Sequence, residues 1–571
     1  EETWFSLHPL FREHLKKAYL RHHEAEARAV MAHAADWFAE RKLWLDAIRL
    51  GLESGEVWQV KLWIEHCATT LIEQGDFTTL VILEKHWKLQ PAECPLPLKM
   101  ARAWAMGLAL EIGPALRLAK QIETELGGLP DQGKSSPIYW EVQSLQAMLL
   151  GLADHNMRSG PWARVCYESS ATRPWITNVL LNLMSGSLLR QANWDAFYQL
   201  PPTLDAQDGN RGYFLHECYR QSLTALAEGL QGRVACALDG LLALVERIDL
   251  SFSDGLAKPN PVLLALPNAL LAHFNYLRGD ASQATHYLQG CMDYIDMGGF
   301  LDCIAHAFVT SARLQVQQGH PGRARRTLER MSSLAQVREW PRLQSWALME
   351  RVRSCLQGER VREAAGCLRE LQQIRAMSLD DGGVDRWLFA LLAELWLGLN
   401  GQPVRAELVT DAQALLTELR QRQYWLMVAE LGVALGFYLA SQQDQRSEAL
   451  LIEALEVVRD TGAVCLLRDI GIPQACATLT PYIPANWRAE VTALFGHAGD
   501  ADEDKAGCSA LLALTVKERQ VMQLVAEGKS NKQIAKDLSV TPETIKSHMK
   551  SIFAKLKVES RAQAAVMLQQ G

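Results

Sequence analysis

Long apolar segments are absent from this 571-residue chain. No stretch approaches the ~20 consecutive apolar residues that a bilayer-spanning helix needs, and no apolar segment opens the sequence. We therefore expect neither a membrane span nor a secretory signal, and a cytoplasmic location. The hydrophobic fraction of 49% and the charged fraction of 22% exclude a disordered or collagen-like chain.

Closely spaced cysteines are also absent. The 12 cysteines are scattered without a CxxC pair, and Cys291 and Cys303 lie twelve residues apart, as do Cys355 and Cys367. That spacing is not typical of metal ligands. The sequence thus predicts no metal site and indicates thiols buried in a reducing compartment.

Strand signals are missing as well, since there is neither an alternating apolar series nor a hairpin turn. Runs rich in Ala and Leu, such as residues 387–397, lie between loops that hold Gly or Pro. These patterns predict an all-α fold.

Turn glycines recur along this helical sequence. Gly232, Gly279, Gly319, Gly358 and Gly401 are spaced by 47, 40, 39 and 43 residues. A glycine is typical of the end of a helix. Helical hairpins of this kind bury a continuous core only when they stack. The spacing therefore predicts a tetratricopeptide-like helical-hairpin solenoid.

Each of these turns is followed, five or six residues later, by an alanine that lets the second helix pack closely against the first. These alanines are Ala237, Ala284, Ala324, Ala364 and Ala406. Weaker turns at Gly75, Gly113 and Gly160 extend the predicted pattern upstream.

Charge is distributed unevenly. From Cys508 to the end there are ten basic and five acidic residues, whereas the other 507 residues carry a net charge of −12. A basic module on an acidic body indicates an end that binds a polyanion. We expect a solenoid sensor domain at 91–490, a flexible acidic linker at 491–510 and the basic module at 511–571.

Helix caps divide the basic module into four short helices. Capping boxes begin at Thr515, Ser530 and Ser560, and Thr541 precedes a proline at the first helical position. The predicted helices are 515–527, 531–538, 542–556 and 560–569. The second and third, joined by a three-residue turn, form a helix-turn-helix.

The third of these helices has an apolar face and a basic face. The apolar stripe consists of Ile545, Met549, Ile552, Phe553 and Leu556. On the other face, Lys546, Ser547 and Lys550 are suited to base edges in the major groove. Six further residues are predicted to hold the DNA backbone: Lys529, Asn531, Lys532, Thr541, Thr544 and Lys557.

The module resembles the LuxR-type (NarL/FixJ) DNA-binding domain. The resemblance lies in LTVKERQV at 514–521, GKSNKQIA at 528–535 and TIKSHMK at 544–550, continued by 555–558 and 560–561. It implies a four-helix domain in which the recognition helix reads bases.

The same resemblance implies a role for the last helix, which pairs two modules as a dimer on DNA. The residues expected to make that contact are Gln563, Val566 and Met567.

A helical-repeat body before such a module is similar to the MalT-like regulators. Residues 4–15 resemble the close of their ATPase portion. The resemblance implies that residues 1–90 are the tail of that portion with connecting helices. It also implies that a nucleotide site, with ATP as its cofactor, lies before Glu1, and that this chain itself holds no cofactor.

Residues 128–135 match the phosphate-binding pattern GxxxxGK[ST], with Lys134 and Ser135 at its end. The motif needs a strand before it and a helix after it. An amphipathic helix at 116–126 precedes this match and Pro137 follows it. We therefore interpret the segment as a loop between repeat helices and expect no enzyme.

Together these features predict a transcriptional regulator, an activator, whose solenoid senses an inducer or a regulatory protein. The expected partners are double-stranded promoter DNA, RNA polymerase and further copies of the chain, without a membrane. Two alternatives stay open, an interaction scaffold without ligand sensing and an ATPase that uses Lys134.

Overall fold

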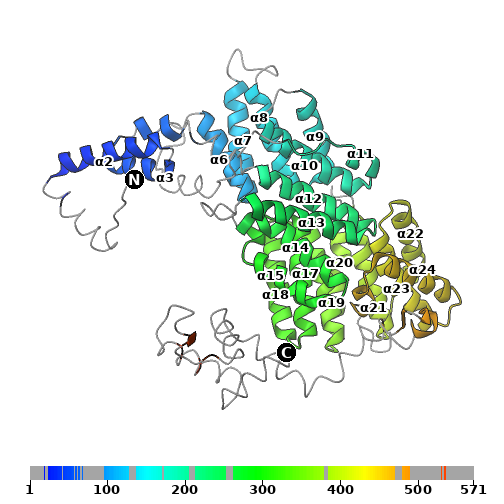
Figure 1. Cartoon of the computed structure of the whole chain (residues 1–571). Helices are drawn as coiled ribbons and strands as arrows, with labels where there is room; N and C mark the ends of the chain where they lie inside the picture. Colours follow the sequence, from blue (N-terminus) through cyan, green and yellow to red (C-terminus); the bar gives the residue numbers. More distant parts are fainter. Residues whose placement is uncertain are drawn as a thin grey trace. The chain divides into compact units, whose positions relative to one another are not determined.

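Helical hairpins follow one another through the computed structural model of the chain (Figure 1). The structure describes residues 19, 23–41, 43–56, 58–60, 62–64, 67, 96–127, 137–169, 173–204, 213–251, 261–377, 383–469, 479–485, 487, 488, 491, 529, 533, 534, 545 and 549. Among these residues the regular elements are helices and none is a strand, which confirms the predicted all-α fold.

The N-terminal half of the described part contains helices that mostly pair with the next helix in sequence. They are α2 (Glu24–Glu40), α3 (Trp44–Ser54), α6 (Leu96–Leu108), α7 (Ile112–Gly127), α8 (Pro137–Leu152), α9 (Asn156–Ser169), α10 (Pro174–Gln191), α11 (Trp194–Tyr198), α12 (Tyr213–Leu230) and α13 (Val234–Ser251).

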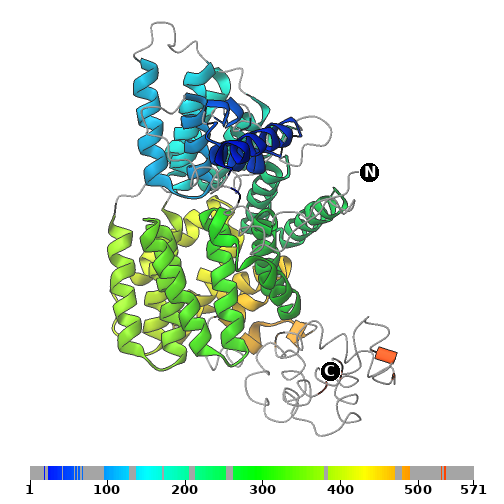
Figure 2. The same cartoon turned by 90° about the vertical axis from the view of Figure 1, so that its left-hand side faces the viewer.

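The same pairing continues in the second half, where neighbouring hairpins stand side by side (Figure 2). Its helices are α14 (Pro261–Leu277), α15 (Ala281–Cys291), α16 (Ile295–Gly298), α17 (Leu301–Gln317), α18 (Pro321–Val337), α19 (Pro341–Gln357), α20 (Val361–Ala376), α21 (Val384–Leu399), α22 (Leu408–Gln421), α23 (Trp425–Ser441), α24 (Arg446–Thr461), α25 (Cys465–Asp469) and the short η2 (Thr480–Tyr482). The predicted helical-hairpin solenoid is confirmed.

The hairpins turn through residues in the left-handed backbone region. Gly232, Gly279, Gly319 and Gly401 have φ values of 82°, 89°, 76° and 73°, as expected of glycines that end a helix. At the remaining predicted turn the left-handed residue is Glu359, with φ of 58°, one position after the predicted glycine.

The turns predicted at Gly113 and Gly160 were wrong. Both glycines lie inside helices, α7 and α9, and the turns are instead at Leu110, Asp154 and Ala192, with φ of 61°, 67° and 55°. Gly75 lies outside the described residues.

Gly160 serves a close helix crossing rather than a turn. A Cβ atom at this position would overlap the side chain of Ser187 on α10, the helix that packs against α9. The glycine therefore allows the two backbones to approach.

Four of the five predicted alanines have side chains that are at most 1% exposed: Ala237, Ala284, Ala324 and Ala364. The prediction for Ala406 was wrong, because this residue is exposed in the loop before α22. Ala412, inside α22, is fully buried and supplies the small residue there.

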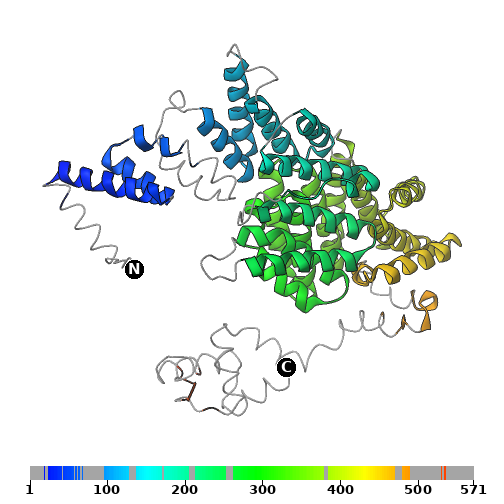
Figure 3. The same ribbon diagram turned by 45° about the horizontal axis from the view of Figure 1, so that its top comes forward.

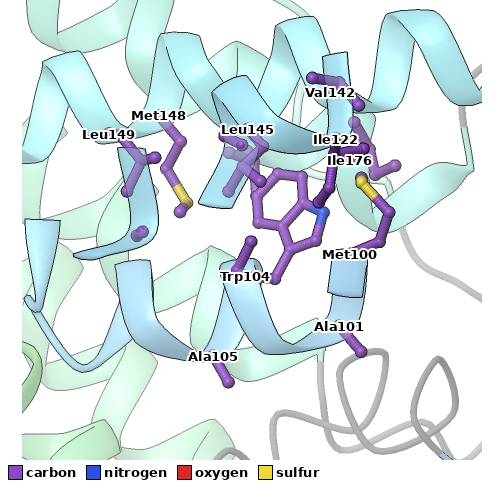
Figure 4. Packing of buried hydrophobic residues seen from close by; sticks show 14 of the residues in the cluster. Met100, Ala101, Trp104, Ala105, Ile122, Val142, Leu145, Met148, Leu149 and Ile176 are labelled. Carbon is purple, nitrogen blue, oxygen red and sulfur yellow. The ribbon is translucent and has the colours of Figure 1, made fainter. Parts of the chain in front are cut away.

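Tryptophans fill spaces between helices, as the core around Trp104 shows (Figure 4). Its indole is fully buried beside Leu145, and its ring centroid lies 4.7 Å from that of Trp175 at an edge-on angle of 74°. Some tryptophans are exposed instead, including Trp58 at 72%.

The solenoid also contacts itself across long sequence separations. The Trp340 indole donates to the carbonyl of Leu152 at 3.1 Å, and the Tyr424 hydroxyl donates to that of Leu189 at 3.0 Å. Helices α12 and α23 also touch, so later hairpins lie against earlier ones (Figure 3). Such contacts form where a superhelix completes a turn and closes on itself.

The chain divides into two compact units, Glu1–Ile483 and Pro484–Gly571. The second contains the segment expected to bind DNA, of which the structure describes five residues after residue 500. The predicted limits at 90, 490 and 510 stay predictions.

Candidate ligand cavity and nucleic-acid interface

Most residues predicted to contact DNA lie outside the described part of the chain. They are the base-reading Lys546, Ser547 and Lys550, the backbone-binding Asn531, Lys532, Thr541, Thr544 and Lys557, and the dimer residues Gln563, Val566 and Met567. Lys529 is described and is partly buried.

Three of the described residues of this module belong to its core. Ile534 and Ile545 are fully buried and Met549 is 6% exposed. All three are helical, and Ile545 and Met549 stand one helical turn apart, where the predicted apolar stripe places them. A buried stripe of this kind holds a short helix on its neighbours.

The segment that matches the phosphate-binding pattern, residues 128–135, also lies outside the described part. The element before it is the helix α7, which ends at Gly127, and the next element, α8, begins at Pro137. A phosphate-binding loop follows a strand. The flanking helices therefore support the interpretation of this segment as a connection between repeats.

The structure has a cavity between helices of the solenoid that no pattern in the sequence predicted. Its volume is about 90 Å³. Apolar walls come from α12, α14, α21 and α23, and five charged side chains also line it: Arg190, Asp302, Arg313, Asp385 and Glu430. We call this space the axial cavity.

One side of the axial cavity is held by Arg342, which is only 1% exposed. Its guanidinium donates to Asp154 at 2.7 and 2.8 Å and to Asp302 at 2.9 Å, and it contacts Asp385 at 3.2 Å. Arg190 binds the same Asp385 at 2.9 Å. These ion pairs join the α8–α9 turn to α10, α17, α19 and α21.

A second set of ion pairs surrounds Arg313. Its guanidinium donates to Glu350 at 3.1 Å and to Asp469 at 2.8 Å. Arg353 also pairs with Glu350, and the Tyr276 hydroxyl donates to Asp469 at 2.7 Å. Burial opposes the charge on Asp469, but the nearby arginines keep the pKa of this carboxyl below its ordinary value.

A row of rings lines the axial cavity. The ring centroids of His273 and His306 are 4.0 Å apart, His306 lies 5.3 Å from Trp346, and Trp346 lies 4.5 Å from Phe389. Burial lowers the pKa of His306 to about 4 and that of His273 well below its ordinary value, so both imidazoles are neutral at pH 7.

A weak signal for the axial cavity was present in the sequence. Arg342, Glu350 and Asp385 stand in helical segments on the same face as buried apolar residues. A charge at such a position is buried and therefore needs a partner. The partners themselves come from helices up to 195 residues away, which only the closed superhelix brings together.

The described residues contain no group of three or more His, Cys, Asp or Glu side chains placed to hold a metal ion. No described helix is both long and apolar enough to cross a membrane.

Comparison with known proteins identifies the C-terminal module. Residues 512–568 match the model of "Bacterial regulatory proteins, luxR family". The HTH-type transcriptional regulator AlkS of Ectopseudomonas oleovorans is 34% identical over 145 residues, which are 25% of this chain and 14% of AlkS. That alignment is longer than the family match, so the similarity includes residues outside it.

The body has a more distant relative. The serine/threonine-protein kinase PknK of Mycobacterium tuberculosis is 24% identical over 358 residues, or 62% of this chain. This chain spans only about a third of the kinase, 31% of its length. Among solved structures, the Cut9–Hcn1 hetero-tetramer of APC/C aligns over 97% of both chains at 13% identity, with a TM-score of 0.40.

The family match covers the residues whose caps and buried stripe predicted a helix-turn-helix, and the hairpin solenoid precedes it. The chain therefore carries a helix-turn-helix domain of the LuxR family at residues 512–568, after a helical-repeat body that fits the MalT-like architecture.

Proposed function

We propose that this chain is a transcriptional activator that binds promoter DNA through residues 511–571 and is controlled by a ligand on its helical-repeat body. The luxR-family match at residues 512–568 carries the proposal. The excess of basic residues in that segment supports it, because phosphates attract such a module.

In this proposal the recognition helix enters the major groove. Lys546, Ser547 and Lys550 read base edges, whereas Lys529 and its basic and polar neighbours hold phosphates. Two modules paired through the helix at 560–569 gain affinity, because the second half-site is bound intramolecularly. The paired modules then recruit RNA polymerase.

We place the protein in the cytoplasm, where promoter DNA and RNA polymerase are found. The nine described cysteines form no disulfide among themselves, which suits a reducing compartment. Helical-repeat and helix-turn-helix domains bind rather than catalyse, and we propose no enzymatic activity. The partial match to PknK is no ground for proposing kinase activity in this chain, since it covers 31% of that kinase.

The axial cavity favours a small molecule over a regulatory protein as the ligand. It is lined by side chains of several helices and is too small to admit a folded partner. A ligand that binds one arrangement of the hairpins better than another shifts the population toward it.

The DNA-binding proposal is tested by selecting sites from random-sequence DNA with the full chain. Lys546→Ala should then cost about 1–3 kcal/mol on the selected site and relax its sequence preference. Lys529→Ala should weaken binding to all DNA sequences alike and reduce the salt dependence of that binding. Lys120→Ala, on the exposed face of α7, is the matched control and should change neither.

Failure to enrich any DNA sequence at low salt would contradict the proposal of a transcriptional regulator. The alternative, an interaction scaffold, would then remain. An unchanged preference in Lys546→Ala would show that the recognition helix was assigned wrongly.

A further inference from the structure

Glu430 differs from the other charged residues of the axial cavity. It lies on α23 and is partly buried, yet its carboxylate has no hydrogen bond or ion pair within the described part of the chain. A carboxylate removed from water without a partner is costly. Burial accordingly raises the pKa of Glu430 above its ordinary value.

The two arginines that line the cavity cannot serve as its partner without losing others. Arg190 is bound to Asp385, and Arg313 is bound to Glu350 and Asp469. An anionic ligand would have to displace one of these carboxylates. Among the described residues that line it, the cavity therefore has no uncommitted cation for a carboxylate or a phosphate.

With all of its carboxylates ionised, the set of charges around the cavity is negative overall. Five arginines, namely 190, 313, 342, 353 and 468, face six carboxylates, namely Asp154, Asp302, Asp385, Asp469, Glu350 and Glu430. The histidines add no positive charge, because His273 and His306 are neutral. One positive charge in the cavity would balance the set.

The ring row offers a flat apolar surface to the body of a ligand. Trp346 and Phe389 line the cavity in contact with each other, and His306 contacts Trp346. Aromatic rings prefer to pack against one another in offset-stacked or edge-on arrangements. The remaining walls, such as Leu226, Leu388 and Leu426, are apolar and suit a hydrocarbon body.

We propose that the axial cavity binds a small organic ammonium ion, whose charged nitrogen pairs with Glu430 and whose flat apolar group lies against Trp346 and Phe389. This inference rests on the proposed function and names the chemical class of its ligand. The volume suits a small organic molecule, because about 90 Å³ is several times the ~10–15 Å³ that one water needs.

Such a ligand would touch the residues that close the superhelix. The cavity is lined by Arg190 and Asp385, whose ion pair joins α10 to α21 across 195 residues. It is also lined by Asp302, a partner of Arg342. The bound ion thus acts on the contacts between early and late hairpins.

The test compares shape-matched probes of opposite charge on the full chain. Phenethylamine and tryptamine are the cations, and 3-phenylpropionate and indole-3-propionate are the corresponding anions. Isothermal titration calorimetry should show binding of at least one amine, with its acid at least about tenfold weaker. Hydrogen exchange should show new protection in α21 and α23.

Glu430→Gln keeps the shape and removes the charge. The variant should bind the amine at least about tenfold more weakly. It should also melt no lower than the parent without ligand, because an unpartnered buried charge has been removed. Glu456→Gln, on the exposed side of α24, is the matched control and should bind the amine unchanged.

Three results would overturn the inference: no binding of either amine at millimolar concentration, acids that bind as tightly as amines, or unchanged amine binding in Glu430→Gln. The same preparation is assayed for selection of DNA sites. If DNA selection succeeds while amine binding fails, only the inference is lost. If DNA selection fails, the proposed function is lost whatever the cavity binds.

Discussion

Buried histidines show how the surroundings of a single residue fix its charge. Burial lowers the pKa of His216 and His306 to about 4 and that of His273 well below its ordinary value. The unfolded chain, with histidine pKa values of about 6.5, binds protons that the folded chain does not bind below that pH. Acid therefore favours unfolding.

This difference predicts a loss of stability between about pH 6.5 and 4. Each neutral histidine contributes stability above pH 6.5, and that contribution falls by up to about 1.4 kcal/mol per pH unit as the pH drops. His306→Gln should therefore show a smaller fall in melting temperature between pH 7 and 5. His286→Gln, at an exposed position on α15, should lose as much melting temperature between pH 7 and 5 as the parent does. An equal fall in both variants would show that His306 is charged in the fold.

At the scale of helices, the sequence predicted the turns that glycine makes and missed the others. Gly232, Gly279 and Gly319 mark turns because they readily adopt positive φ. Leu110 and Ala192 adopt the same backbone conformation without any such signal, since the packing of the two helices imposes it. The upstream hairpins were therefore predicted in the wrong register.

The close crossing of α9 and α10 predicts the effect of one methyl group. Gly160→Ala should destabilise the solenoid by about 1–3 kcal/mol, because the new Cβ overlaps Ser187 and the helices must move apart. Gly322→Ala on α18, where the Cβ meets nothing within 4 Å, should be neutral or slightly stabilising. Thermal melts of the two variants check this, and equal melting temperatures would contradict it.

On the scale of the whole solenoid, Arg342 joins the α8–α9 turn to α17 and α21 from its place on α19. Arg342→Ala leaves Asp154, Asp302 and Asp385 short of their shared cation. It should cost about 3–5 kcal/mol, as removal of one partner from a buried ion pair does. Arg326→Ala, on the exposed face of α18, is the control and should cost little.

The readout for Arg342→Ala is the melting temperature together with hydrogen exchange of α8 and α21. Faster exchange in both helices would show that the contact between early and late hairpins has opened. An unchanged melting temperature would show that the network does not hold the solenoid closed.

The whole-molecule arrangement also explains what the sequence could and could not predict about the sites. Caps and an apolar stripe are local patterns, so they predicted the helix-turn-helix from about sixty residues of sequence. The axial cavity depends on the pairing of residues such as Arg190 and Asp385, which stand in different hairpins. No local pattern specifies how far a superhelix winds before it closes.

The closing contacts have a consequence for how the protein is made. The carbonyls of Leu152 and Leu189 leave the ribosome long before their donors, Trp340 and Tyr424, which follow 188 and 235 residues later. Early hairpins can form as they emerge, since their contacts are local. Their inner ion pairs must wait until α19 and α21 have been synthesised. During translation the early hairpins thus form an open array whose charged interior residues are exposed to water. These residues become buried only after the last hairpins have been synthesised.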